Sequence, residues 1–459
     1  MGSRAGFERW LLSAVALGLL ALQISAFHGL RLDDAYITYR YGQNLASGLG
    51  LVFNAGQRVQ GSTSPGQMLL AALVYAVFGQ ARTPDVLAAI GCVAWNAQAA
   101  ALYLLLARAL GRVSAALLAL SVAFGVTSAA FWVPLETNLA AAFVLIAFVC
   151  AQRQAWLTAI VSCGVATFVR PDGCLAAAVL LATCGWRERR RALWLGAMFA
   201  SIVLPWPLFA TIYYGSPVPQ TAIAKFQRVG VLEYLKHELS LPGVRLLWDE
   251  PGVALTLLMP ALALLGAWRL IRRERALGAF VVYGVLHAAA YLVLRPFTSH
   301  TWHLYPWTLV FCVCALAALA PQWKPQWSAV DCARTCLLSL ALGVSIMRFA
   351  GECRTADSGY WTGQRDAVYR RIAAYMSAHA RPGEWFASVE VGTLAYFSGL
   401  PAYDLGGLVT RHDDPMQDHP VRFIVLDKAY LAMAPSRLPV FSAQEGDFMA
   451  RVYDMAPGN

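Results

Sequence analysis

The chain contains a succession of apolar segments, many of them long enough to cross a lipid bilayer, and this limits its fold more than any other feature. A helix needs about 20 mostly apolar residues to span the hydrocarbon core. Charged residues make up only 14% of the 459 residues, against roughly 25% in an ordinary soluble domain. A cytosolic enzyme, a disordered chain and a secreted disulfide scaffold are therefore excluded. Candidate spans are Trp10–Leu30 and segments near 85–107, 113–131, 136–151, 155–170, 173–186, 192–213, 252–268, 276–294, 304–320 and 330–349.

Basic residues indicate how these segments are threaded through the membrane. The first apolar segment is too long for a signal-peptide core, so we expect it to remain as a span. Segment 66–79 has only 14 residues and suits a re-entrant or interfacial helix better than a crossing. The chain then has eleven spans, with its N-terminus inside and its C-terminus outside. The inner connections hold 15 Lys and Arg in 46 residues, whereas the outer ones hold 10 in 109, as the positive-inside rule expects.

The character of the sequence changes after about residue 350. Residues 357–381 have the pattern of an amphipathic helix that Pro382-Gly383 would end. Residues 385–389 and 421–427 have the pattern of buried strands. We therefore predict an α-helical polytopic membrane protein of about 11 transmembrane helices. Residues 1–350 form its membrane domain, with a long first outer loop at 31–84, and residues 351–459 form a small α/β domain on the outer side.

The first outer loop begins with two adjacent carboxylates, Asp33 and Asp34. Adjacent carboxylates repel one another, which favours proton uptake by one of them. Such a pair can serve as a general base or bind a cation. A purely structural alternative stays open, because Asp is also common as the cap of a helix N-terminus.

Other ionisable residues fall on the same predicted face. Ionisable side chains at membrane depth are candidates for function, although each has a structural alternative, such as pairing between Arg170 and Asp172. Together with the acidic pair they describe a site that binds an anion and holds its own base, as a lipid-phosphate sugar donor requires. Nucleic-acid binding is not supported, because the basic residues follow span ends. The candidates are Glu136, Arg170, Lys225, His300 and His303.

Several motifs carry a family resemblance that spans most of the chain. They include Asp33-Asp34-Ala35-Tyr36-Ile37-x2-Arg40-Tyr41-x2-Asn44-Leu45, Gly48-x-Gly50-Leu51-Val52-Phe53-Asn54, Gly61-x-Thr63-Ser64-Pro65, Leu135-Glu136-Thr137, Arg170-Pro171-Asp172-Gly173, Tyr214-Gly215-x2-Val218-Pro219-x-Thr221-x2-Ala224-Lys225, Gly392-Thr393-Leu394-Ala395-Tyr396-Phe397-Ser398-Gly399 and Asp404-Leu405-Gly406-Gly407-Leu408. The sequence resembles the GT-C superfamily of integral-membrane glycosyltransferases. Within it, the closer likeness is to bacterial arabinofuranosyltransferase-like members, including the mycobacterial terminal and pilin types.

The resemblance implies an inverting transfer of a sugar, arabinofuranose by analogy, from a polyprenyl phosphate to an envelope glycan or a pilin-like protein. It implies that Asp33 or Asp34 is the general base and that Arg40, Tyr41 and Asn44 help to bind the donor. It places the protein in the bacterial inner membrane, with its site facing the periplasm. No cofactor is implied with certainty, although a divalent cation is compatible with the acidic pair. Asp172 stands where the family has Glu, Gln220 stands where it has Asn, and Gly66-Gln67 replaces an aromatic residue, so sugar and acceptor stay open.

Two other functions are compatible with the same residues. A transporter or flippase of a polar or lipid-linked substrate would account for charges near the spans. Transporters usually contain internal repeats and charges at the membrane midplane, and neither is evident in this sequence. A structural membrane subunit is the third possibility, in which the acidic pair would only cap a helix.

Overall fold

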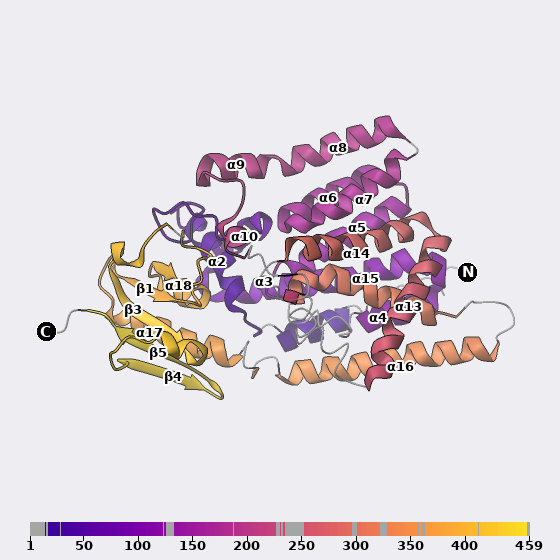
Figure 1. The fold of residues 1–459 in the computed structure, drawn as a ribbon. Helices are drawn as coiled ribbons and strands as arrows, with labels where there is room; N and C mark the ends of the chain where they lie inside the picture. The colour runs from indigo at the N-terminus through magenta and orange to yellow at the C-terminus, as the bar shows by residue number, and fades with distance from the viewer. Residues whose placement is uncertain are drawn as a thin grey trace. The chain divides into compact units, whose positions relative to one another are not determined.

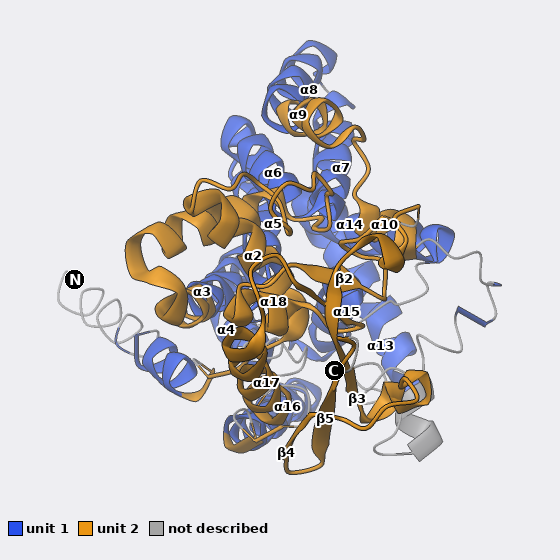
Figure 2. Ribbon diagram, turned by 90° about the vertical axis from the view of Figure 1, so that its left-hand side faces the viewer, with its two compact units in different colours: residues 1–25, 90–204, 226–353 blue, residues 26–89, 205–225, 354–459 orange. Residues whose placement is uncertain are grey.

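The apolar segments form helices in the computed structural model of the chain. Contact clustering divides the chain into two compact units, each made of three segments (Figure 2). Unit 1 comprises residues 1–25, 90–204 and 226–353, and unit 2 comprises residues 26–89, 205–225 and 354–459. The structure describes residues 14, 17–27, 29–122, 124, 133–186, 188–225, 230, 233–234, 252–295, 301–321, 328–355, 358–359, 363–411 and 413–456.

Unit 1 is a bundle of apolar helices, several of which lie side by side in Figure 1. Their bounds follow the apolar segments of the sequence closely, because each run of apolar residues forms one helix. The last helix crosses into unit 2 at its C-terminal end. The helices are α3 (Pro65–Leu110) from residue 90 onward, α4 (Arg112–Ser121), α5 (Thr137–Gln152), α6 (Trp156–Val169), the 3-10 turn η3 (Pro171–Gly173), α7 (Cys174–Gly185), α8 (Arg189–Val203), α13 (Gly252–Arg273), α14 (Arg275–Leu294), α15 (Thr301–Leu319) and α16 (Ala329–Thr355).

Five helices within the described part of the chain are long and apolar enough to cross a membrane. They cover Pro65–Leu110, Arg189–Tyr214, Arg275–Leu294, Trp302–Leu319 and Ala329–Thr355. Shorter apolar helices occupy other segments that the sequence marks as spans, among them Thr137–Gln152 and Trp156–Val169. A multi-pass helical membrane protein is therefore confirmed in outline, and the number of eleven spans stays a prediction.

Gly79 divides α3 into two helices. Its backbone has φ 73° and ψ 175°, in the left-handed half of the map that glycine adopts without strain. The short apolar segment 66–79 thus ends at a break, and a separate helical segment continues to Leu110. Whether segment 66–79 crosses the membrane or lies at its surface stays a prediction.

The connections within unit 1 gather at two opposite ends. At one end, Gln152 Nε2 donates to Glu274 Oε2 at 2.7 Å and to the Leu105 carbonyl at 2.9 Å. At the other end, Arg170 Nη1 donates to Thr137 Oγ1 at 3.0 Å. Thr137 and Gln152 bound α5, whose 16 residues extend about 24 Å at 1.5 Å per residue. The two clusters therefore lie at opposite ends of α5, and the orientation of these ends in the membrane stays a prediction.

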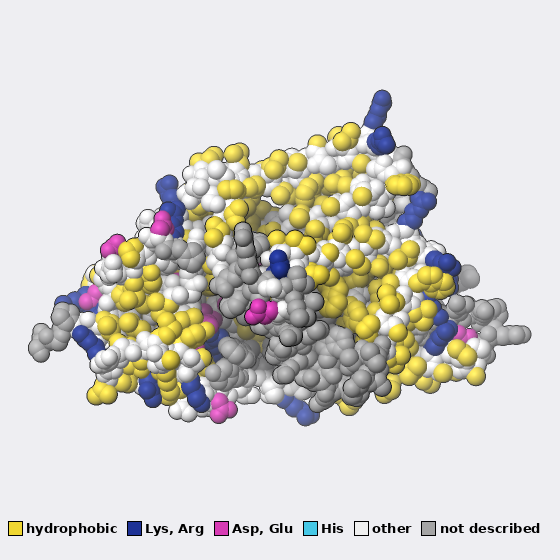
Figure 3. All heavy atoms as spheres, viewed as in Figure 1, with side chains coloured by type: hydrophobic (Ala, Val, Ile, Leu, Met, Phe, Trp, Pro, Cys, Tyr) yellow, Lys and Arg dark blue, Asp and Glu magenta, His cyan; other side chains and the backbone are white. Residues whose placement is uncertain are grey.

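The surface of unit 1 suits a lipid environment. Large apolar side chains are strongly exposed along its helices, including Leu193, Leu264 and Val293 at 73–75%. In Figure 3 the yellow apolar side chains cover the length of these helices, and dark-blue Lys and Arg side chains mark their right-hand ends. Close helix contacts use small residues, as is common in membrane proteins. A Cβ at Gly266 of α13 would lie 1.7 Å from the Cys314 carbonyl of α15.

Unit 2 contains the C-terminal α/β fold predicted from the sequence. Its mixed five-stranded sheet has the order β2-β1-β3-β5-β4, with β1 parallel to β2 and β3, and β5 antiparallel to β3 and β4. Strand β3 has the bounds that the sequence predicts, and β1 is one residue shorter. Strands β2, β4 and β5 were not predicted. The elements are α17 (Arg365–His379), β1 (Trp385–Ser388), α18 (Gly392–Ser398), β2 (Ala402–Asp404), η5 (Met416–Asp418), β3 (Val421–Asp427), η6 (Lys428–Met433), β4 (Phe441–Glu445) and β5 (Phe448–Asp454).

Residues 31–84, which the sequence predicts to be the first outer loop, fold together with this C-terminal part. Helix α2 (Asp33–Ala46) packs against α18. Tyr41 and Phe53 of the loop share one hydrophobic core with α17 and with Phe386 of the sheet. Two further helices, α9 (Pro205–Tyr214) and α10 (Gln220–Lys225), complete unit 2. Burial of these aromatic rings ties the acidic pair to the sheet domain, although more than 300 residues separate them in the sequence.

Candidate active site

The acidic pair lies in the first turn of α2, and its two members have different surroundings. Asp33 is 7% exposed. Its Oδ2 accepts the Gly392 N–H at 3.0 Å, and its Oδ1 accepts the Thr393 N–H at 2.8 Å. These are the first two residues of α18, where backbone N–H groups lack partners within the helix. The Asp33 side chain therefore caps the N-terminus of α18, and Asp33 is also the first residue of α2.

Asp34 is half-buried, and its carboxylate has no hydrogen bond or ion pair to any residue that the structure describes. Consecutive residues of a helix point about 100° apart, so both carboxylates cannot face α18. One carboxylate is held by backbone amides, and the other is left available. A general base needs this availability, because it must reach the proton that it removes.

The other loop residues expected at the site are bonded to the protein backbone. Arg40 donates to the Gly399 carbonyl at 3.0 Å and to Gln43 at 2.9 Å. The Tyr41 hydroxyl donates to the Val59 carbonyl at 2.5 Å. Asn44 donates to the carbonyls of residues 52 and 53, both at 2.8 Å. These bonds fix the loop around α2, and a role of the three side chains in donor binding stays a prediction.

Three motifs far apart in the sequence meet around Gly61. A Cβ on Gly61 would lie 2.5 Å from the Val409 side chain, so this position requires glycine. The Thr221 hydroxyl of α10 donates to the Gly61 carbonyl, and the Gln220 N–H donates to the carbonyl of residue 60 at 2.8 Å. Helix α10 ends at Lys225, which is half-buried. The structure thus brings Lys225 into the same unit as the acidic pair.

Asp404 organises the turn that contacts Gly61. Its carboxylate accepts the N–H groups of Gly406, Leu408 and Val409 at 2.8, 2.6 and 3.0 Å. Burial nevertheless raises the pKa of Asp404 to about 6, and the nearby charge of Asp33 adds to the rise. The turn after β2 is therefore held by one buried carboxyl group.

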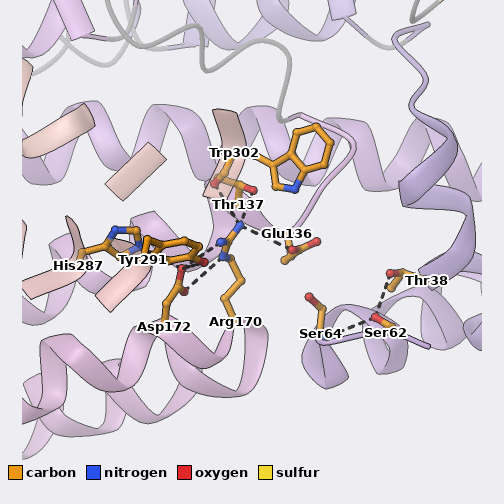
Figure 4. Close-up of polar contacts among 10 residues, drawn as sticks. All are labelled: Thr38, Ser62, Ser64, Glu136, Thr137, Arg170, Asp172, His287, Tyr291 and Trp302. Atoms are coloured by element: carbon orange, nitrogen blue, oxygen red, sulfur yellow. Dashed lines mark hydrogen bonds and ion pairs between the residues drawn. The ribbon is translucent and has the colours of Figure 1, made fainter. Parts of the chain in front are cut away.

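Unit 1 contains a second polar cluster, centred on Arg170 (Figure 4). The Arg170 Nη2 donates to Asp172 Oδ2 at 2.9 Å, and Nε donates to Oδ1 at 3.3 Å. Its Nη1 reaches Thr137 Oγ1 at 3.0 Å, the Trp302 carbonyl at 3.3 Å and Glu136 at 3.8 Å. Arg170 is 5% exposed, and a buried guanidinium needs this set of acceptors.

Asp172 is also bonded from α14. His287 Nε2 lies 3.2 Å and the Tyr291 hydroxyl 3.3 Å from Asp172 Oδ2. The His287 ring is fully buried and stacks on Tyr291, which stacks in turn on His303. The structure therefore brings Glu136, Arg170 and His303 to one end of unit 1, whereas His300 lies outside the described residues.

The sequence did not single out His287 or Tyr291, because each is one polar residue in an apolar helix. Asp172 was recognised as a possible partner of Arg170 and as part of a family motif, but not as a partner of His287 or Tyr291. The spacing of His287 and Tyr291, four residues apart on one helix face, is the signal that could have marked them. Glu390 and Arg365 of unit 2 were also missed, and they form an ion pair.

Among the described residues, the acidic side chains are not grouped as the ligands of a divalent cation would be. Both oxygens of Asp33 accept backbone N–H groups, and Glu390 is paired with Arg365. Within the described ranges, no three His, Cys, Asp or Glu side chains are grouped so that they could hold a metal ion.

Comparisons with known proteins identify the fold. ArnT from Cupriavidus metallidurans bound to undecaprenyl phosphate matches with TM-score 0.66 and 16% identity over 98% of each chain. The archaeal oligosaccharyltransferase AglB from Archaeoglobus fulgidus, in complex with an inhibitory peptide and a dolichol-phosphate, matches with TM-score 0.59 and 12% identity. That match covers 93% of this chain and 70% of AglB. At these identities the two matches show that this chain has a fold similar to that of ArnT and AglB.

Sequence comparison adds little to this assignment. A family model described as a domain of unknown function (DUF8728) matches residues 359–453, which belong to unit 2. No curated protein matches the chain. Assignment of an activity therefore depends on the chemistry of the residues within each unit.

Proposed function

We propose that the protein is a glycosyltransferase that moves a sugar from a polyprenyl phosphate to a hydroxyl group of an acceptor. The observation that carries this proposal is the unequal acidic pair, in which two backbone amides fix Asp33 and no described residue bonds to the Asp34 carboxylate. The fold supports it, because both neighbours named above were solved with a lipid phosphate. By resemblance, the sugar is arabinofuranose and the acceptor is an envelope glycan or a pilin-like protein outside the bacterial inner membrane.

In this proposal Asp34 is the general base and Asp33 is a positioning residue. Asp34 takes the proton of the acceptor hydroxyl as its oxygen forms a bond to the anomeric carbon of the sugar. The bond between that carbon and the phosphate oxygen breaks, and the polyprenyl phosphate leaves with the electron pair. Attack from the face opposite the phosphate inverts the anomeric carbon. The backbone bonds of Asp33 hold the first turn of α2 while this happens.

The leaving phosphate requires a positive charge, and Lys225 is our candidate within unit 2. It is half-buried at the end of α10, and it makes no ion pair with any described residue. Arg170 is a weaker candidate for direct phosphate binding, because Asp172 already occupies one edge of its guanidinium. We propose instead that Arg170 holds Glu136 and the N-terminal end of α5 in place.

The proposal is tested with purified protein and a panel of polyprenyl-phosphate pentoses that includes arabinofuranose. Mass spectrometry identifies the donor consumed and the product formed. We expect Asp34→Asn to abolish transfer with little change in thermal stability. Asp33→Asn should reduce transfer and lower the melting temperature as well, because an amide replaces one of its two acceptor oxygens.

Asp447→Asn is the matched control, because Asp447 is an exposed aspartate of the same unit. Wild-type rates in both Asp34→Asn and Asp33→Asn would rule out the assigned chemistry. Movement of a lipid-linked sugar across vesicles without any glycosyl product would favour the flippase alternative.

A further inference from the structure

The break in α3 contacts α18 within unit 2, and one residue from each helix bonds to the other across this contact. The Gln80 Nε2 donates to the Tyr396 carbonyl at 2.5 Å, and the Tyr396 hydroxyl donates to the Gln80 carbonyl at 3.0 Å. Tyr396 is fully buried, and Gln80 directly follows Gly79, where α3 is broken. Each residue therefore gives a side-chain donor to the backbone carbonyl of the other.

Both of these carbonyls lack the partner that a helix usually supplies. In a helix the Gln80 carbonyl would accept the N–H of the fourth residue onward, which is Pro84, and proline has no N–H group. Tyr396 is one of the last four residues of α18, whose carbonyls have no partner within the helix. A buried carbonyl without a donor is destabilising. The Gln80–Tyr396 pair therefore satisfies two groups that their own helices leave open.

The same short segment of α3 also contacts the chain just before the acidic pair. Asp85 forms an ion pair with Arg31, which lies two residues before Asp33. The Asp33 carboxylate in turn accepts the first two N–H groups of α18 at 3.0 and 2.8 Å. Residues 80–85 are thus bonded to α18 and to the residues that lead into α2, the two parts of the chain that fix Asp33.

We propose that Gln80 and Tyr396 are positioning residues of the transfer reaction. Their two bonds hold α18 at the break in α3, α18 holds the Asp33 carboxylate through two amides, and Asp33 fixes the helical turn that carries Asp34. In this role neither residue takes a proton or contacts the reacting atoms. The inference rests on the glycosyl transfer proposed above, and it extends the machinery of that reaction to a helix that is long and apolar enough to cross a membrane.

The test measures kcat and KM of the full-length protein with the polyprenyl-phosphate pentose that the wild type consumes in the panel above. Gln80→Met keeps the length of the side chain and removes its donor, and Tyr396→Phe removes the hydroxyl alone. We expect each variant to lower kcat about 3- to 10-fold, as loss of one hydrogen bond implies. KM for the donor should stay within about twofold, because neither side chain contacts substrate. The double variant should be no more than about twofold slower than the slower single variant, because both substitutions break the same pair.

Gln444→Met and Tyr403→Phe are the matched controls. The Gln444 side chain is exposed and donates to the Gly446 carbonyl at 3.0 Å. The Tyr403 hydroxyl donates to the Asp414 carbonyl at 2.9 Å. Both controls remove a donor to a backbone carbonyl of the sheet domain outside α18, so we expect them to keep the wild-type kcat.

A substitution at the break itself tests whether the pair depends on the backbone of α3. A Cβ at Gly79 would meet nothing within 4 Å, so Gly79→Ala penalises only the left-handed backbone with φ 73°. We expect it to lower kcat as Gln80→Met does, because a straightened helix moves Gln80 away from Tyr396. Gly383→Ala is its control, since Gly383 has φ 89°, equally open surroundings and a place beyond the end of α17.

Two readouts separate positioning from a general structural role. In an Asp33→Asn background, where the link between α18 and α2 is already weakened, Gln80→Met should lower kcat by less than about twofold further. A general loss of folding would act equally in both backgrounds. Hydrogen exchange of the Gly392 and Thr393 amides, measured without substrate, should be faster in Gln80→Met than in Gln444→Met.

Failure of the inference can be distinguished from failure of the proposed function. Wild-type kcat in both Gln80→Met and Tyr396→Phe would overturn the inference alone, and so would an equal loss from Gln80→Met in both backgrounds. Equal exchange of the two amides in Gln80→Met and Gln444→Met would also overturn it, whether or not the protein turns over. Absence of transfer by the wild type with every donor overturns the proposed function, and the positioning role with it.

Discussion

Gly392 is the position at which a single methyl group should separate the acidic pair from the sheet domain. A Cβ there would lie 2.0 Å from the Asp33 carbonyl oxygen and 3.0 Å from Asp33 Oδ2. Backbone atoms cannot yield as a flexible side chain can, so Gly392→Ala must move α18 away from α2. Overpacking of this kind costs about 1–3 kcal/mol. Loss of the two N–H···O bonds to Asp33 adds about 1.5–3 kcal/mol per bond.

We therefore expect Gly392→Ala to destabilise unit 2 by at least about 4 kcal/mol if both bonds are lost. Thermal unfolding in detergent should register this as a lower melting temperature, and limited proteolysis should cut the 354–459 segment sooner. Gly343→Ala is the control, because a Cβ at Gly343 of α16 would meet nothing within 4 Å. Equal melting temperatures and equal proteolysis rates in the two variants would refute the reasoning.

Two further predictions concern the other buried ion pairs and carboxyl groups. Burial raises the pKa of Asp404 from 3.8 to about 6, so the folded state binds the Asp404 proton more tightly than the unfolded chain does. The folded state therefore loses about 3 kcal/mol of stability as pH rises from about 4 to 6. Unfolding at several pH values should show that loss in the wild type and not in Asp404→Asn. Arg170→Leu should cost about 3–5 kcal/mol, because it leaves Asp172, whose side chain is only 13% exposed, without its cation. Arg153→Leu is the control for Arg170→Leu, because Arg153 is exposed. Equal melting temperatures of these two variants would contradict the prediction for Arg170.

The helices of unit 1 could be predicted from the sequence because each one follows from a local run of apolar residues. A membrane span needs a continuous apolar run, and the runs at 276–294 and 304–320 became α14 and α15 within three residues at each end. Strand β3 was predicted correctly for a similar reason, since Val421–Asp427 is a short apolar run bounded by turns. Local hydrophobicity is sufficient for elements of this kind.

The contacts that give the candidate site its chemistry could not be predicted in the same way. The bond between Asp33 and Gly392 joins residues 359 positions apart, and no local pattern encodes such a distance. His287 is one polar residue in an apolar helix, and its partner Asp172 lies 115 positions away. The packing of loop 31–84 into the core of the sheet domain was likewise hidden, because its aromatic residues look alike whether they face lipid, water or a neighbouring strand.

The sequence presents Asp33 and Asp34 as equivalent, and the helix makes them different. Because consecutive side chains diverge by about 100° around a helix, one carboxylate of such a pair can be buried against a neighbouring element only if the other is turned away from it. Burial against the start of α18 gives the Asp33 carboxylate two fixed backbone donors and leaves Asp34 half-exposed. An adjacent acidic pair can therefore combine a carboxylate that is free to reach substrate with a neighbouring carboxylate that is held still. In the proposed reaction the sheet domain would therefore contribute to the site, since it supplies the backbone donors that make the two aspartates unequal.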